Sequence, residues 1–129
     1  MTDEMNSAGK VPPAGPYKLV VFDWDGTILD TTAAIAISIQ YAAEKMGLPV
    51  PSATNARSVI GLGWRDAMKI IAPTCPEEEF PQFGAYYVER YRPEEGKVHL
   101  FPGIENVIRT LHERGVTLAI ATGKSRRGL

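Results

Sequence analysis

Residues 18–27 read Lys18-Leu19-Val20-Val21-Phe22-Asp23-Trp24-Asp25-Gly26-Thr27, an apolar run that leads directly into two carboxylates. A short run of this composition, followed by turn-forming residues, predicts a strand over 19–23 that is buried on both faces. The acids then lie at its exposed C-terminal end, where open α/β sheets bind their ligands. Gly26 lets the backbone bend just past the acids, and Thr27 offers a hydroxyl and an N–H group to an oxyanion.

The spacing of Asp23 and Asp25 places two carboxylates so close that they repel each other unless a cation neutralises them or one carries a proton. This indicates a hard cation, and Mg²⁺ above all, because Mg²⁺ is often held by one or two carboxylates plus a substrate phosphate. It also indicates a division between a nucleophile and an acid/base. The alternative is a solvated turn with two incidental acids. An EF-hand is excluded, because position 6 of such a loop would be Ile28 and position 12 would be Ala34.

The composition is that of one soluble globular domain, with 129 residues, 44% hydrophobic and 22% charged. A net charge of −1 gives no electrostatic reason to expect a nucleic acid or an anionic membrane as partner. The single cysteine, Cys75, fits the reducing cytoplasm. Residues 1–16 are polar and rich in proline and glycine, so we expect a disordered leader and no signal peptide. No apolar run approaches the roughly 18 residues that a membrane span needs.

The spacing of apolar residues over 31–98 predicts an all-helical insert that contains no second strand. Its first helix should begin at Asp30 or Thr31 and run to about Met46, with Ile35, Ile39 and Ala42 in an apolar stripe that Ile37 and Tyr41 widen. That width predicts a helix covered on more than one side. Two helices should follow, over 53–59 and from Trp64 to before Pro73.

The last helix of the insert should begin in the run Pro76-Glu77-Glu78-Glu79, with a kink or a restart near Pro81. Its apolar side carries Phe80, Phe83, Tyr87 and Tyr91. Aromatic residues at helical spacing are far more often packing residues than a binding site, so we interpret this stripe as packing.

A second strand is predicted over 116–121, after a helix over 103–114, and it runs into Thr122-Gly123-Lys124-Ser125. A P-loop would need a glycine at position 118, which is Leu118. The remaining interpretation is that the Thr122 hydroxyl and the Gly123 N–H group bind phosphate oxygens. Lys124 either adds positive charge there or is simply solvated. Two strands with helices between them predict a parallel α/β fold.

These motifs together resemble those of the haloacid dehalogenase-like hydrolase superfamily. The segment 23–27 is similar to its first signature, Thr122-Gly123 to its second, and Phe101-Pro102-Gly103-Ile104 to the return into the core domain. The helical insert resembles the superfamily's cap. The resemblance covers residues 18–129, and within the superfamily the chain is most similar to phosphoglycolate phosphatase-type members.

The resemblance implies a Rossmann-like core over 17–30 and 99–129, a cap over 31–98, and Mg²⁺-dependent hydrolysis of a small phosphorylated metabolite. Asp23 would be the nucleophile that forms an aspartyl phosphate, and Asp25 the acid/base. The Asp23 carboxylate and the Asp25 backbone carbonyl would hold Mg²⁺. Asp25 also separates the chain from the superfamily's dehalogenases, which lack an acid there.

The sequence departs from the family's pattern after the second signature. The third signature, a lysine, and the fourth, one or two acids that complete the metal site, lie further along in the family than Leu129. A phosphomutase and a non-catalytic phosphate-binding remnant therefore stay open as alternatives. Arg65, in the loop region that should face the acids, could read a substrate carboxylate or form a surface salt bridge.

We therefore expect an incomplete domain that is inactive and poorly stable alone, because two strands with open apolar edges do not make a stable sheet. The test compares residues 1–129 with a chain extended by about another half-domain. A cooperatively melting, Mg²⁺-dependent phosphatase from the short chain would contradict this expectation, and would mean that self-association supplies what is missing.

Overall fold

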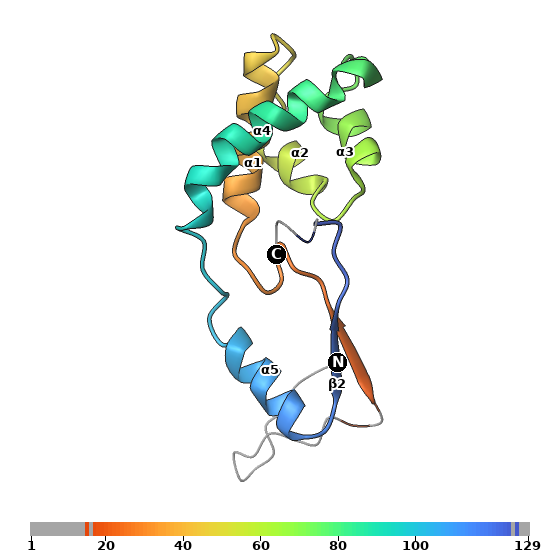
Figure 1. The fold of residues 1–129 in the computed structure, drawn as a ribbon, viewed down its shortest axis with the longest axis vertical. Coiled ribbons are helices and arrows are strands. Elements are labelled where there is room, and N and C mark those ends of the chain that lie inside the picture. Colours follow the sequence, from red (N-terminus) through yellow and green to blue (C-terminus); the bar gives the residue numbers. More distant parts are fainter. Residues whose placement is uncertain (1–14, 16, 125, 127–129) are drawn as a thin grey trace.

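The computed structural model describes residues 15, 17–124 and 126. Most of the expected leader and Ser125 lie outside the described residues. In chain order, the elements are β1 (Leu19–Phe22), α1 (Thr32–Lys45), α2 (Ala53–Ser58), α3 (Trp64–Ile71), the 3₁₀ helix η1 (Glu77–Glu79), α4 (Phe80–Glu95), α5 (Ile104–Glu113) and β2 (Thr117–Ile120). Helices α1 to α4 gather at one end of the molecule, and the strands with α5 form the other (Figure 1).

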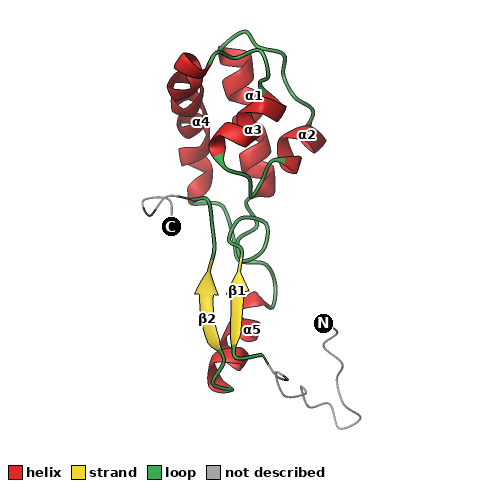
Figure 2. Cartoon of the chain, turned by 90° about the vertical axis from the view of Figure 1, so that its right-hand side faces the viewer, coloured by secondary structure: helices red, strands yellow, loops and turns green. Residues whose placement is uncertain are grey.

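Strands β1 and β2 lie side by side and parallel, with Leu19 opposite Thr117 and Phe22 opposite Ile120. Helix α5 connects back to β2 and packs against it on one face of the pair (Figure 2). Because the strands are parallel, their C-terminal ends meet at the same edge, next to the helical insert. The predicted parallel α/β fold with an inserted helical part is confirmed.

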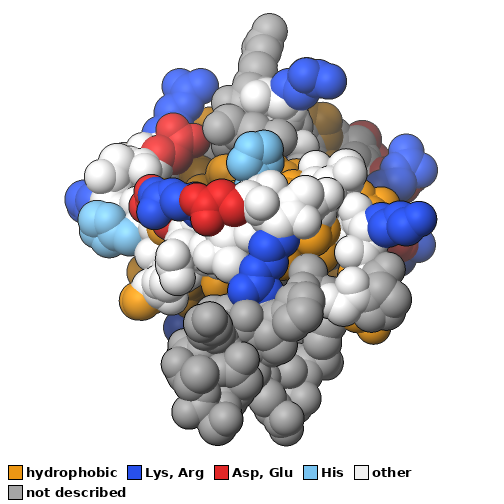
Figure 3. Space-filling model, turned by 90° about the horizontal axis from the view of Figure 1, so that it is seen from below, with side chains coloured by type: hydrophobic (Ala, Val, Ile, Leu, Met, Phe, Trp, Pro, Cys, Tyr) orange, Lys and Arg blue, Asp and Glu red, His pale blue; other side chains and the backbone are white. Residues whose placement is uncertain are grey.

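The prediction that both strands are buried on both faces is wrong for the described structure. Val20 and Phe22 are partly buried on one face, whereas Leu19 and Val21 are each 52% exposed on the other. Ile120 is 49% exposed on the neighbouring strand. Among the described helices, α5 makes the main contact with this sheet, and the side chains on the other face are left exposed. Seen from this end of the molecule, hydrophobic side chains appear at the surface between charged ones (Figure 3).

The helical insert has a core of its own. α1 packs against α4 and α2, and Met68, Phe83 and Ala42 are fully buried. The expected restart near Pro81 is confirmed, since η1 ends at Glu79 and α4 then begins with proline in its first turn, where no N–H partner is needed. Ile37 is predicted to widen the stripe of α1 but is 42% exposed, and small buried residues on both flanks widen the stripe instead. Those are Ala34, Ala36, Ser38 and Ala43.

The two segments that join the insert to the strands are tied to each other. The N–H of Asp30 donates to the carbonyl of His99 at 2.8 Å, and the N–H of Phe101 donates to the carbonyl of Ile28 at 3.0 Å. The insert is therefore attached through one paired connection, which fixes where its underside meets the strand ends. No helix among the described residues is long and apolar enough to cross a membrane.

Met68 and Ile70, on the same helix α3, provide a matched test of this core. Met68→Ala should lower the free energy of unfolding by about 2–5 kcal/mol, because the side chain is fully buried. Ile70→Ala should change it by no more than about 0.5 kcal/mol, because Ile70 is 51% exposed. Urea unfolding followed by circular dichroism measures both. Equal effects of the two substitutions would contradict the assigned core.

Candidate active site

The turn that follows β1 presents the two acids. The carbonyl of Trp24 accepts the N–H groups of Thr27, Ile28 and Leu29 at 3.2, 2.9 and 3.2 Å, which closes the backbone into a tight loop. Gly26 sits in this loop with φ +77°, a conformation that glycine adopts without steric cost. The expected bend at Gly26 is confirmed. Because the Thr27 N–H group is used inside the turn, its exposed hydroxyl is the group that remains for an oxyanion.

Asp23 and Asp25 leave this turn in different environments. Asp23 is exposed, and its Oδ1 accepts the N–H of Trp24 at 2.7 Å. The side chain of Asp25 is only 18% exposed, and its Oδ1 accepts two bonds, from Thr31 Oγ1 at 2.8 Å and from Lys124 Nζ at 3.2 Å. Asp23 can therefore approach a substrate freely, while Asp25 is held in one orientation.

Thr31, which the sequence predicts only as a possible helix cap, also contacts the candidate site. It is fully buried, and its hydroxyl makes no capping bond to α1. Instead, the hydroxyl donates to Asp25, six residues earlier. A threonine at the start of a helix carries no local signal for such a contact, because the turn at 24–29 must first bring the two residues together.

Lys124 is the second anchor of Asp25, so the interpretation as a solvated lysine is wrong. Its side chain is 16% exposed, its Nζ lies 3.1 Å from the hydroxyl of Tyr91, and it stands 4.9 Å from the centre of that ring. Burial lowers the pKa of Lys124, but the Tyr91 hydroxyl and the Asp25 carboxylate outweigh burial and raise it above the ordinary value of 10.5. Lys124 is therefore a fixed cation at neutral pH, shared between the strand end and the insert.

The loop after β2 is shaped around Thr122. The backbone N–H of Lys124 donates to Thr122 Oγ1 at 3.1 Å, so the hydroxyl proton of Thr122 stays available to another acceptor. A Cβ added to Gly123 would lie 3.8 Å from the carbonyl oxygen of Leu62, which is ordinary contact distance. The insert therefore reaches directly onto this loop.

The segment 60–63 of the insert also lies over the acids. A Cβ on Gly61 would stand 3.9 Å from Asp23 Oδ2, and the φ of +95° at Gly61 disfavours any side chain there. Arg65, just beyond this segment, pairs with Glu77 at 3.4 Å and its side chain is 77% exposed. Of the two interpretations of Arg65, this geometry favours the surface salt bridge.

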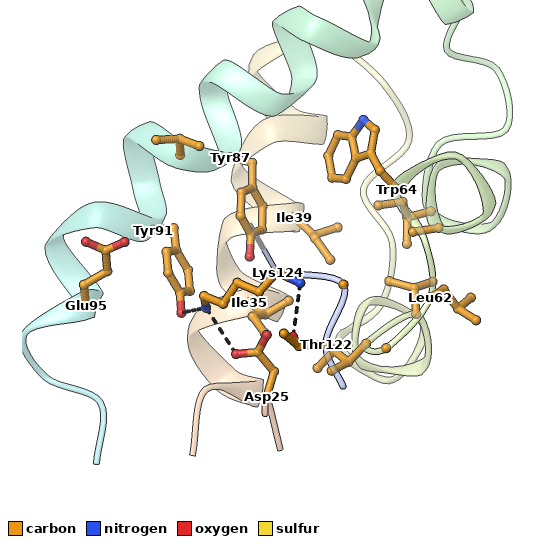
Figure 4. A pocket seen from close by; sticks show the side chains of 17 residues that line it. Asp25, Ile35, Ile39, Leu62, Trp64, Tyr87, Tyr91, Glu95, Thr122 and Lys124 are labelled. Atoms are coloured by element: carbon orange, nitrogen blue, oxygen red, sulfur yellow. Dashed lines mark hydrogen bonds and ion pairs between the residues drawn. The ribbon is translucent and has the colours of Figure 1, made fainter. Parts of the chain in front are cut away.

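A cavity of about 320 Å³ opens between the insert and the strand ends. Figure 4 shows Asp25, Thr122 and Lys124 at one side of it and aromatic side chains from the insert at the other. Gly123 also lines it, so four of the six predicted site residues meet there. Asp23 and Thr27 lie outside the described lining, although Asp23 is close to Gly61, which belongs to it.

The aromatic stripe of α4 packs as predicted but also forms a wall of this cavity. Phe83 is fully buried, whereas Tyr87 and Tyr91 both face the cavity. These two rings stack with centroids 5.6 Å apart, and Trp64 meets Tyr87 edge-on at 6.3 Å. Burial raises the pKa of Tyr87, so its hydroxyl stays protonated. Interpreting the stripe as packing alone was therefore incomplete, because a sequence cannot tell which packed ring also borders a cavity.

The described residues contain no cluster of three or more His, Cys, Asp or Glu side chains suited to a metal. They do present the exposed carboxylate of Asp23 at the turn, and the backbone carbonyl of Asp25, two residues on, stays the predicted second oxygen ligand. Two protein oxygens fit Mg²⁺, which keeps several waters and commonly uses one or two carboxylates together with substrate phosphate.

Comparisons with known proteins agree with this geometry. A family model described as haloacid dehalogenase-like hydrolase matches residues 20–129. A phosphoglycolate phosphatase from Vibrio cholerae is 31% identical over 116 residues, which cover 83% of this chain and 51% of that protein. Tyrosine-protein kinase PtkA from Mycobacterium tuberculosis is 31% identical over 114 residues, covering 88% of this chain and 38% of the kinase.

A crystal structure from Haemophilus somnus, described as a predicted phosphoglycolate phosphatase, superposes with a TM-score of 0.69 at 26% identity. The superposition covers 86% of this chain and 53% of the Haemophilus somnus chain. The chain thus spans about half the length of the curated phosphatases it matches.

The bridge between Lys124 and Asp25 predicts a pH-dependent contribution to stability. Lys124→Met should lower the free energy of unfolding by about 1.5–3 kcal/mol at neutral pH, because it removes a hydrogen bond to a carboxylate. The pKa of Lys124 is raised in the folded chain, so this contribution is complete below the ordinary value of 10.5 and declines as the pH rises through the folded value.

Above neutral pH, the difference between the parent chain and Lys124→Met should therefore shrink only in strongly alkaline buffer, as measured by urea unfolding across this range. Lys97→Met is the control, because Lys97 is 70% exposed and should matter little at any pH. A difference between parent and Lys124→Met that is already lost at neutral pH would contradict the assigned bridge.

Proposed function

The chain belongs to the haloacid dehalogenase-like hydrolase family, and from this premise we propose that it supplies the nucleophile and the acid/base of a phosphate monoester hydrolase. The observation that carries the proposal is the meeting of the two strand ends. Lys124 Nζ and Asp25 Oδ1 are 99 positions apart in sequence and 3.2 Å apart in space. The Lys124 ammonium thus lies beside Asp25, and the same loop carries the Thr122 hydroxyl and the Gly123 N–H group. This supports the proposal, because a transferring phosphoryl group requires such donors and positive charge.

In the proposed reaction, an oxygen of the exposed Asp23 carboxylate attacks phosphorus, and the bond from phosphorus to the ester oxygen breaks. Asp25 enters this step with a proton taken up from solvent and gives it to the departing alcohol oxygen. Water then attacks the phosphorus of the aspartyl phosphate, Asp25 takes a proton from that water, and inorganic phosphate leaves. Since Thr31 and Lys124 both donate to Oδ1 of Asp25, Oδ2 is the oxygen assigned to carry the proton.

Phosphate oxygens would be received by the loop after β2. The Thr122 hydroxyl and the Gly123 N–H group donate to them, and the Lys124 ammonium supplies positive charge close by. The Thr27 hydroxyl, in the turn that follows β1, is a further donor in this proposal, because Thr27 is exposed. When bound at the Asp23 carboxylate and the Asp25 carbonyl, Mg²⁺ supplies charge neutralisation for the carboxylate and the phosphoryl oxygens.

We further propose that full activity belongs to a longer polypeptide. Two observations support this: the matched phosphatases are about twice as long, and one face of the β1–β2 sheet has no cover in the described structure. Lys124 is also the single cation on the described lining of the cavity, and it is already paired with Asp25. Further positive groups would be needed to stabilise the negative charge of a phosphoryl group during transfer.

In a polypeptide continued to the length of its relatives, Asp23→Asn should lower kcat for hydrolysis of an aryl phosphate by roughly three orders of magnitude or more, because it removes the attacking carboxylate. Asp30→Asn is the matched control, an exposed acid of the same segment, and should leave kcat unchanged. The assay measures released phosphate with and without Mg²⁺ and after chelation, which should abolish turnover. Activity that survives Asp23→Asn would rule out this nucleophile.

The same assay should compare the 129-residue chain with a polypeptide continued to the length of its relatives. We expect turnover only from the longer form. Products must also be identified: free phosphate supports the hydrolase, whereas an isomerised sugar phosphate would indicate a mutase. Phosphate passed to a tyrosine of another protein would indicate the transfer that the name of the related PtkA describes.

A further inference from the structure

The cavity between the insert and the acids is mostly apolar. Its walls on the insert side come from α1, the segment 59–62, α3 and α4 (Figure 4). They include the side chains of Ile35, Ile39, Val59, Leu62, Trp64 and Tyr87. At about 320 Å³ it has room for a small ligand, at the lower end of the roughly 300–1,000 Å³ typical of such pockets.

The charges around this cavity do not suit a substrate whose alcohol part carries a carboxylate. The charged residues on its described lining are Asp25, Glu95 and Lys124. The one cation among them already serves the Asp25 carboxylate and the Tyr91 hydroxyl. Arg65 lies off this lining and pairs with Glu77 at the surface. A substrate carboxylate in the apolar part of the cavity would lose its hydration, and the described lining offers it no cation that is not already paired, which is unfavourable.

We infer that this site takes phosphate esters of apolar alcohols, aromatic ones above all, in preference to esters of small hydroxy acids. The inference rests on the proposed function, because the phosphate must bind at the loop 122–124 for the alcohol to extend toward the insert. The stacked rings of Tyr87 and Tyr91, with Trp64 edge-on to Tyr87, offer an aromatic wall to a bound ring. Phosphoglycolate, the substrate in the name of several relatives, leaves this wall unused.

The first experiment compares esters whose leaving alcohols have similar acidity, so that only the apolar body differs. With the Mg²⁺-activated longer polypeptide, kcat/KM for 2-phenylethyl phosphate should exceed that for ethyl phosphate about 10-fold to 100-fold, because the phenyl ring removes apolar surface from water. It should exceed the value for 2-phosphoglycolate by at least as much. Equal values for the three esters, or a preference for phosphoglycolate, would overturn the inference.

A single substitution should reverse the preference. Leu62 lines the cavity and is 44% exposed, so a longer side chain has space there. Leu62→Lys adds a cation and should raise kcat/KM for 2-phosphoglycolate about 10-fold while lowering it for the phenylethyl ester. Val50→Lys, an exposed apolar residue outside the lining, controls for the added charge and should change neither. The same response from both variants would contradict the assigned role of the cavity.

Binding of non-hydrolysable phosphonates separates this inference from the proposed reaction. Calorimetry should show that 3-phenylpropylphosphonate binds about 10-fold or more tightly than phosphonoacetate, and that Leu62→Lys reverses the order. This result without turnover of any ester would support the apolar site and reject the hydrolase. Turnover with phosphonoacetate as the tighter ligand would support the hydrolase and reject the apolar site.

Discussion

The contact between Lys124 and Asp25 is the interaction on which the site depends. It joins the loop after β2 to the turn after β1, and these meet only because the two strands are parallel and in register. Thr31 adds the start of α1 to the same carboxylate, and Tyr91 adds α4 to the same ammonium. One carboxylate and one ammonium thus connect both strands to the first and last helices of the insert. Both side chains are mostly buried, so each charge needs the opposite charge of the other to compensate for its lost hydration.

The local elements could be predicted from the sequence because their signals are local. The hydrophobic spacing marks α1 and α3, Pro81 marks the restart at α4, and the apolar runs mark both strands. The degree of burial could not be predicted in the same way. A Val- and Leu-rich strand predicts cover on both faces, but cover depends on what packs there, and α5 supplies it on one face alone.

The residues of the candidate site also fall into those with a local sequence signal and those without one. Asp23, Asp25, Thr122 and Gly123 could be identified from the residue types that follow each strand. Thr31, Tyr91 and the fixed position of Lys124 could not, because each contact joins segments that only the folded chain brings together. The separation in sequence is six residues for Thr31 and Asp25, and 33 for Lys124 and Tyr91. Spacing of these kinds has no periodicity that a sequence pattern could show.

The position of the insert matters for Lys124 more than for Asp25. The insert joins the strands through the paired segments at 28–30 and 99–101, whereas Lys124 and Asp25 both lie on the strand side of that connection. A rotation of the insert about the connection would therefore separate Tyr91 from Lys124 and leave the Lys124–Asp25 pair together. The ammonium would then exchange a tyrosine hydroxyl for water or for an oxygen of a bound phosphate. The contact with Tyr91 thus links closure of the apolar cavity to the one cation on its described lining, while the Lys124–Asp25 pair stays together.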